Sequence, residues 1–222
     1  MSQDKTILIA GMAPGLGTAL QARFEQGGYC VVGVSRQAPS PWAVDLTDAL
    51  ATHALFQQLD ERCPPLAGVI HNAMQFHRQA MLDTTPQTLQ SVWQSMVLTA
   101  FNTAQAAIPR LQRAGGGSLI FSGASGSLRA GPRFAAFSSA KFALRGLAQA
   151  LAREHNPDGI HVAHVVIDGL IRSKKTEQRF APGRSEPLIE PDALAEQYFQ
   201  LFHQAPSVWS DEVNFRPVLT SH

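Results

Sequence analysis

Several features that would indicate a membrane protein or a nucleic-acid-binding protein are scarce in this sequence. Its 222 residues carry a formal net charge of only +1, and lysines and arginines are scattered along the chain. No charged surface for nucleic acid or anionic lipid is therefore predicted. The apolar run after the amino terminus is far shorter than a signal segment or a membrane span, which predicts a cytoplasmic protein without membrane association. We expect its partners to be small molecules.

Cysteine is equally scarce, and metal-ligand spacings are missing. Cys30 and Cys63 form no Cys-x-x-Cys pair and no disulfide framework, so we interpret them as reduced structural thiols, with redox sensing as the less favoured alternative. His161 and His164 are three residues apart in a predicted strand and therefore point to opposite faces. No zinc spacing occurs elsewhere in the chain, so we predict no metal site.

Short β-rich runs alternate with long helical patterns along the chain. The predicted strands cover residues 6–10, 30–35, 68–71, 118–122, 161–167 and 213–216, and the predicted helices cover 17–26, 49–62, 88–114, 138–155 and 191–204. Strict alternation predicts an α/β fold, a doubly wound parallel sheet of the Rossmann type with helices on both faces. With 45% hydrophobic residues, residues 1–222 can bury the core of a single domain. The polar stretch 172–190 is predicted to be a mobile segment at the ligand-binding edge of the sheet.

A glycine-rich turn follows the first predicted strand and opens the first predicted helix. Glycines permit a tight turn, let the backbone approach a pyrophosphate and leave helix N–H groups directed at it. The turn reads Gly-Met-Ala-Pro-Gly-Leu-Gly, and its candidate phosphate-binding residues are Gly11, Gly15, Leu16 and Gly17. The alternative is an ordinary glycine-rich connection between a strand and a helix.

This turn and three later motifs resemble those of the short-chain dehydrogenase/reductase family over nearly the whole chain. The family's first turn carries a threonine where this chain has Ala10. The family also has a Pro-Gly turn that holds the nicotinamide carboxamide, and this chain has Asp168 in the place of that proline. The resemblance implies a nicotinamide dinucleotide cofactor. It assigns cofactor contacts to Asp45 and Leu46, to Asn72 and Ala73, and to Gly169, Ile171 and Ser173.

The end of the second predicted strand bears on the choice of cofactor. An acidic residue there would bind the ribose hydroxyls of NAD(H), whereas this chain has Ser35 and Arg36. A guanidinium can bind a phosphate with two hydrogen bonds, so NADP(H) is predicted in preference to NAD(H). The alternative is that Arg36 only solvates the end of a strand.

The catalytic residues that the resemblance implies are mostly replaced. Phe137 stands in the frame Tyr-x-x-x-Lys where the family has its acid, and a phenyl ring carries no exchangeable proton. Lys141, four residues later and on the same helix face, matches the lysine that binds the nicotinamide ribose. Met96 occupies the position of the relay asparagine, where its simplest role is core packing.

The family's serine has no clear counterpart. Alignment on the following glycine places it at Gly123, and counting back from Phe137 places it at Ala124. Ser122 is expected to face the wrong side of the sheet because side chains alternate along a strand. Ser125 is the remaining candidate if the next loop is one residue shorter than usual.

We therefore expect an NADP(H)-binding oxidoreductase of atypical active site. Two mechanisms stay open at this point. One is reduction of a substrate that needs no tyrosine, such as an activated alkene or an iminium ion, with any proton taken from water, Ser125 or His77. The other is a dinucleotide-binding protein without catalysis that senses cofactor redox state or carries a ligand. The long helices 88–114 and 138–155 resemble those that pair in the family, which implies a homodimer or homotetramer.

Overall fold

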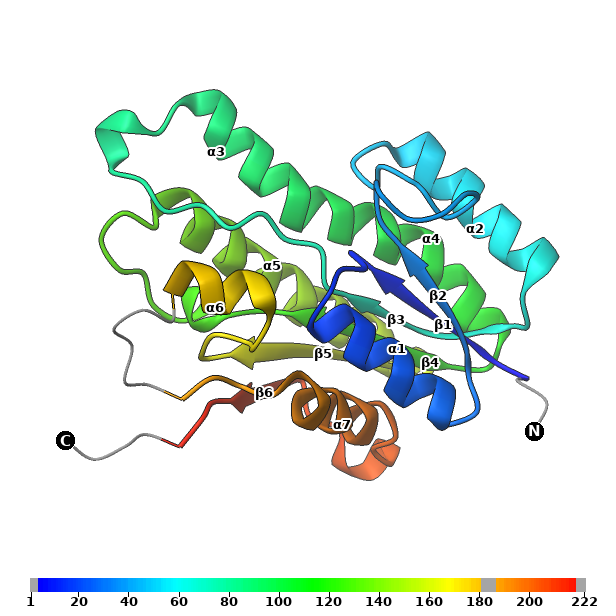
Figure 1. Cartoon of the computed structure of the whole chain (residues 1–222). Helices are drawn as coiled ribbons and strands as arrows, with labels where there is room; N and C mark the ends of the chain where they lie inside the picture. Colours follow the sequence, from blue (N-terminus) through cyan, green and yellow to red (C-terminus); the bar gives the residue numbers. More distant parts are fainter. Residues whose placement is uncertain (1–3, 181–186, 219–222) are drawn as a thin grey trace.

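A six-stranded parallel sheet forms the centre of the protein (Figure 1). The computed structural model describes residues 4–180 and 187–218. The strand order is β2-β1-β3-β4-β5-β6, and every neighbouring pair is parallel. The strands are β1 Thr6–Ala10, β2 Cys30–Val34, β3 Leu66–His71, β4 Gly117–Ser122, β5 Ile160–Ile167 and β6 Glu212–Phe215. This confirms the predicted fold class.

Helices cover both faces of the sheet, so its strands are buried on two sides. On one face, Phe56 of α2 (Ala49–Arg62), Leu111 of α4 (Thr99–Arg113) and Leu144 of α5 (Ala135–His155) belong to one apolar cluster. On the other, Phe24 of α1 (Leu16–Gln26) and Tyr198 of α7 (Pro191–Phe202) belong to a second. Figure 1 shows α1 and α7 on the opposite side of the sheet from α2, α4 and α5.

The topology places a ligand site at the carboxyl ends of the strands. The chain continues from β1 to β2 on one side and from β3 to β4 on the other, so the order reverses between β1 and β3. A crevice opens at such a switch point in doubly wound sheets. At the same edge of the sheet, His71, Phe121 and His164 lie side by side on neighbouring strands.

Two segments differ from the sequence-based expectation. The predicted helix 88–114 consists of α3 (Pro86–Trp93), a π-helical turn (Gln94–Leu98) and α4, because the wider turn inserts at Met96. In the stretch 172–190, residues Lys174–Phe180 form a further helix, α6, and Ile171 pairs with Ile189. Residues 181–186 of that stretch lie outside the described part. Its predicted mobility stays a prediction.

Candidate active site

A cavity of about 1790 Å³ lies at the carboxyl ends of the strands. This exceeds the roughly 300–1,000 Å³ of a site for one small ligand, so it can hold a dinucleotide and a substrate together. Sixteen of the residues that the sequence assigned to the site line this cavity. They are Gly11, Gly15, Leu16, Gly17, Ser35, Arg36, Asp45, Leu46, Asn72, Ala73, Ser125, Phe137, Lys141, Gly169, Ile171 and Ser173. His77 is absent from the lining residues of the described chain.

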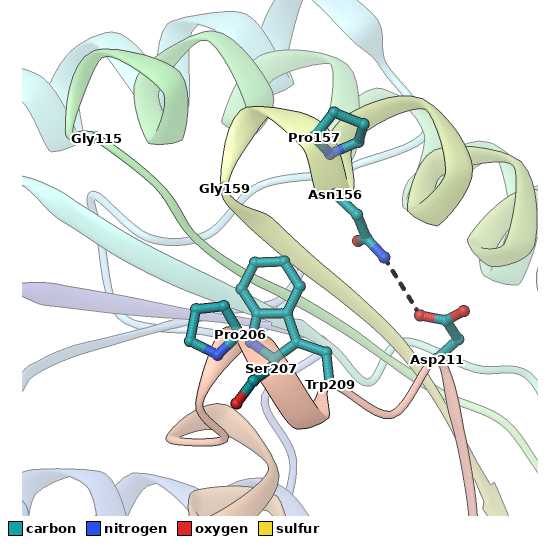
Figure 2. Close-up of a pocket in the computed structure, with 8 residues that line it drawn as sticks. All are labelled: Gly115, Asn156, Pro157, Gly159, Pro206, Ser207, Trp209 and Asp211. Carbon is teal, nitrogen blue, oxygen red and sulfur yellow. Dashed lines mark hydrogen bonds between the residues drawn. The ribbon is translucent and has the colours of Figure 1, made fainter.

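A second hollow of about 650 Å³ lies at the opposite edge of the sheet, before β4, β5 and β6 (Figure 2). The amide nitrogen of Asn156 lies 3.3 Å from Asp211 Oδ1 there. With the amide rotated, it donates instead to the carbonyls of Ile160 and Ala152. In both arrangements Asn156 connects the end of α5 to a neighbouring segment, through Asp211 in the first and through Ile160 in the second.

The glycine-rich turn is held by a close crossing of backbones. Gly11 has φ +90°, and a Cβ atom there would lie 2.3 Å from the backbone nitrogen of Ala73. Gly15, with φ +96°, precedes α1 and provides no side-chain cap, so the first N–H groups of the helix are free to bind an anion. A Cβ atom at Gly17 would lie 3.3 Å from Met12 Sδ, so this glycine lets the helix pack on its own turn.

The adenine end of the cavity is formed by the chain after β2. Ser35 pairs with Ala43, which brings the segment with Asp45 beside β2. Asp45 Oδ1 accepts hydrogen bonds from Thr47 N (3.0 Å) and Thr47 Oγ1 (2.8 Å). These two bonds, and more weakly the charge of Arg36, lower the pKa of Asp45. The buried Asn102 of α4 donates to the carbonyl of Leu46 at 3.0 Å and fixes this loop.

The turn after β5 closes the other end. A Cβ at Gly169 would lie 2.9 Å from Ile189, so only glycine fits there without movement. Ser173 Oγ accepts from Thr176 N at 3.1 Å and begins α6. Asp168 receives both of its hydrogen bonds from Arg129, at 2.9 and 3.0 Å, which neutralises that carboxylate.

Lys141 is the buried cation of the site. Its side chain is 2% exposed, yet it lines the cavity, and its Nζ donates to the carbonyl of Ser122 at 2.7 Å. Burial lowers its pKa to about 8. The Phe137 ring lies 5.9 Å from Nζ, so no phenol stands between the ammonium group and the cavity. Lys141 therefore holds an exchangeable proton at the place where the acid is missing.

Apolar side chains surround that position. Phe137 packs against Phe76 and Phe134, with ring centroids 5.5 and 6.3 Å apart. Met96 is fully buried in the same cluster, which agrees with its predicted packing role. Phe137 and Met96 thus lie in an apolar cluster, and neither side chain can transfer a proton.

Gly123, one of the two candidate serine positions, has no room for a side chain. A Cβ at Gly123 would lie 2.3 Å from Nε2 of His164, so the imidazole occupies the space of any side chain at this position. Ser122 points to the other face, as predicted, and contacts the hydroxyl of Tyr198 at 2.9 Å. Ser125 lies in a short 3₁₀ turn (Ser125–Ser127) and lines the cavity.

Two buried histidines beside Lys141 were not predicted as site residues. His164 Nδ1 lies 3.0 Å from Glu212 Oε2, and Glu212 also accepts two bonds from Arg145, at 2.6 and 2.8 Å. Because the bond from Arg145 lowers the pKa of Glu212, the carboxylate is charged and Nδ1 carries the proton. Burial lowers the pKa of His164 to about 4 and that of His71 to about 3, the latter helped by the charge of Lys141.

Each of these neutral rings therefore has one nitrogen without a hydrogen. Thr99 Oγ1 donates to the carbonyl of Ser95 at 3.0 Å, so His71 Nε2 donates to Thr99 at 2.9 Å. Nδ1 of His71 and Nε2 of His164 are buried, and neither has a hydrogen-bond partner within the described residues. The sequence signal was histidine in two otherwise apolar strands, His71 in β3 and both His161 and His164 in β5.

The cavity fits a nicotinamide dinucleotide. The free helix N–H groups after Gly15 suit the pyrophosphate, Arg36 suits a phosphate at the adenine end, and Lys141 suits a ribose at the other. Across residues 4–180 and 187–218, no group of three or more potential ligand side chains could hold a metal ion. In the same residues no helix is both long and apolar enough to cross a bilayer.

Known proteins with similar sequence and structure are oxidoreductases. "Probable galactose dehydrogenase GalD" of Rhizobium meliloti is 26% identical over 190 residues, which cover 78% of this chain and 74% of the relative. A short-chain dehydrogenase from Rhodopseudomonas palustris is 28% identical, with a TM-score of 0.81 over 97% of this chain and 99% of its own.

Two more distant structures show the same fold. ElxO with NADP bound has a TM-score of 0.85 at 18% identity, over 95% of this chain and 96% of its own. A short-chain oxidoreductase from Pseudomonas aeruginosa, described as containing an atypical catalytic center, has a TM-score of 0.85 at 17% identity over the full length of both chains. The family model for short chain dehydrogenases matches residues 5–182, and with the cavity described above this shows that the chain belongs to the short-chain dehydrogenase family.

Proposed function

We propose that this protein is an NADP(H)-dependent oxidoreductase in which Lys141 supplies the proton that a tyrosine supplies elsewhere in the family. The observation that carries the proposal is the placement of Lys141: a buried ammonium group that lines the cavity beside Phe137 and contacts the carbonyl of Ser122. A bound nicotinamide supplies or accepts a hydride. Lys141 then delivers the balancing proton to the substrate from Nζ, and the neutral amine regains it from solvent.

The pKa of Lys141 suits this role. At about 8 it leaves the side chain protonated at pH 7 yet able to release the proton, which is where general acids are most effective. Loss of the serine and the tyrosine removes two donors that would polarise a ketone oxygen. The proposed substrates are therefore ones that need less polarisation: an activated alkene, which takes up both the hydride and the proton from Lys141, or an iminium ion, which takes up the hydride alone.

Arg36 supports a preference for NADP(H) over NAD(H). It is exposed at the end of β2 and lines the cavity, where a guanidinium can bind a phosphate with two hydrogen bonds. Asp45, the nearby carboxylate, has one oxygen committed to Thr47. ElxO, which shares the fold, was solved with NADP, and this agrees with a cavity of this shape holding that cofactor.

Loss of NADPH absorbance across a panel of activated alkenes, imines, quinones and ketones tests the proposal. The rate with an accepted substrate should fall as pH rises through about 8, because the acid form of Lys141 is lost there. Lys141→Met should lower the rate by about 10²–10⁴-fold. Lys5→Met changes an exposed lysine far from the cavity and serves as the control.

The alternative, a dinucleotide-binding protein without catalysis, makes the opposite prediction. NADPH would bind but would not be consumed by any member of the panel. A rate unaffected by Lys141→Met would also contradict the proposed proton donor.

We also propose that the chain assembles as a homodimer or larger oligomer through α4 and α5. Phe101 on α4 and Phe142 on α5 are 47% and 44% exposed on the same layer of the protein. Large apolar side chains at the surface are typical of protein interfaces. Light scattering at micromolar concentration tests this, and a monomeric mass would contradict it.

A further inference from the structure

The substrate end of the cavity combines an aromatic wall with an arginine. Phe76, Phe134 and Phe137 all line it, and their ring centroids lie 5.5 to 6.3 Å apart. Arg78 also lines the cavity, and its guanidinium carbon lies 5.6 Å from the centroid of Phe134. A ligand that touches these rings is therefore within reach of a cation.

The backbone fixes this arrangement at the expense of local strain. Arg133 has φ +72°, a left-handed conformation that is strained for an L-residue with a long side chain. Its carbonyl accepts a hydrogen bond from Gln79 N at 2.8 Å. That bond joins the loop of Phe76 and Arg78 to the turn before Phe134. Ser91 Oγ donates to Gln75 Oε1 at 3.0 Å and holds the same loop against α3.

The charges around the cavity are unbalanced in favour of cations. The described lining residues include five cations, Arg36, Arg78, Arg129, Lys141 and Arg216, and two carboxylates, Asp45 and Asp168. Asp168 is paired with Arg129, and Asp45 lies beside Arg36 at the adenine end. Arg78 forms no ion pair within the described part of the chain.

We propose that the substrate is an organic acid with an aromatic or similarly flat apolar body, whose body lies on Phe76, Phe134 and Phe137 and whose carboxylate binds Arg78. Arginine binds a carboxylate with two parallel hydrogen bonds, which would also fix the direction in which the body points toward Lys141. The inference rests on the proposed function, because it assigns this end of the cavity to the substrate. The inference also narrows the range of proposed substrates. Lys141 and Arg78 repel an iminium cation, so an unsaturated acid is the favoured substrate class.

Binding of matched probes tests the inference without turnover. Titration calorimetry with 4-phenylbutanoate, its amide 4-phenylbutanamide, and butanoate is run in the presence of NADP⁺. The carboxylate should bind about 10- to 100-fold more tightly than the amide, as expected for one charged contact. Butanoate should bind much more weakly than 4-phenylbutanoate because it lacks the ring.

Variants assign the preference to Arg78. Arg78→Gln should reduce the difference between acid and amide to less than threefold and leave the amide affinity unchanged. Arg153→Gln, which removes an exposed arginine near the far end of α5, should preserve the difference. Arg78→Lys should retain part of the affinity difference between acid and amide. This variant separates the contribution of the charge from that of the guanidinium packing on Phe134.

Three results would overturn the inference: equal affinities for acid and amide, a difference that persists in Arg78→Gln, or one that disappears only in Lys141→Met. Failure of the proposed function has a different signature. Tight, Arg78-dependent binding of the acid without NADPH consumption by any unsaturated acid would leave this site standing and reject the reductase. NADPH consumption restricted to neutral substrates would leave the reductase standing and reject the carboxylate site at Arg78.

Discussion

Replacing Lys141 with methionine should stabilise the folded protein at neutral pH, although it removes the proposed proton donor. Burial lowers the pKa of Lys141 from 10.5 to about 8. Each unit of pKa difference corresponds to about 1.4 kcal/mol, so the charged side chain lowers the free energy of unfolding by about 3 kcal/mol at pH 7. Methionine loses the contact with the Ser122 carbonyl, worth about 1 kcal/mol. The net expectation is a gain of about 2 kcal/mol.

The predicted gain in stability of Lys141→Met should depend on pH, which a change in side-chain packing alone would not produce. Between the folded pKa of about 8 and the unfolded value near 10.5, the unfolded state binds more protons than the folded state at Lys141. The wild-type free energy of unfolding therefore increases, because of this group, as pH rises through that window. Lys141→Met has no such group. The amount by which its free energy of unfolding exceeds that of the wild type should therefore shrink steadily above pH 8 and be lost near pH 10.

Urea unfolding followed by tryptophan fluorescence, at a series of pH values, measures the difference. Lys5→Met controls for loss of a lysine charge at the surface and should show no such dependence. A variant less stable than wild type at pH 7, or one whose advantage is the same at every pH, would refute the assignment of Lys141 as a strained, buried cation.

Three other substitutions test separate parts of the site. Arg36→Ala should weaken NADPH binding by about 1.5–3 kcal/mol and leave NADH nearly unchanged in fluorescence titrations; equal losses would contradict the phosphate contact. Gly11→Ala should lower the free energy of unfolding by about 3 kcal/mol or more, because its Cβ meets Ala73. Gly28 also has a positive φ but nothing within 4 Å of its Cβ position, so Gly28→Ala should lower the free energy of unfolding by only about 1–2 kcal/mol. Gly123→Ser should destabilise the protein unless His164 is also made small, for example as His164→Ala; a stable single variant would show that the imidazole moves aside.

The sequence predicted the sheet because its signals are local. Apolar runs of five to eight residues and a glycine-rich turn depend on neighbours in the chain, and they identified all six strands to within two residues. The π-helical turn at Met96 and helix α6 were missed. A π turn is set by packing around the inserted residue, and α6 is stabilised by Arg172, which contacts Glu177 and Glu190 at 2.8 Å each.

The residues predicted for the cofactor side rest on a related kind of signal. Gly11 and Gly15 have positive φ, a backbone conformation that favours glycine and that a motif records directly. The chain segments that hold the predicted residues come from the ends of neighbouring strands, so a correct topology brings them together. Residues that act through long-range side-chain contacts were not found. Asn102 reaches a carbonyl 56 residues away, and no local pattern distinguishes it from any helical asparagine.

On the catalytic side, position in the sequence left alternatives open. Gly123 was one of two candidates for the serine position, and the sequence offered no reason for a glycine there. His164 provides it, because its ring fills the space from the adjacent strand and is fixed by Glu212, 48 residues away. Gly123 and His164 therefore depend on each other sterically, because a side chain at position 123 would need the space that the ring of His164 fills.

That interdependence limits what a single reversion can do. Phe137 lies among Phe76, Phe134 and Met96, and its neighbour Lys141 is a buried cation whose pKa burial has lowered to about 8. A phenol at position 137 would gain Lys141 as a partner but would face an apolar wall and a serine position closed by His164. Because an apolar environment disfavours the phenolate, burial would raise the pKa of the new phenol while Lys141 lowered it. The proton on Lys141 would remain the more easily released of the two, so the chemistry of this cavity is expected to run through the lysine even with the tyrosine restored.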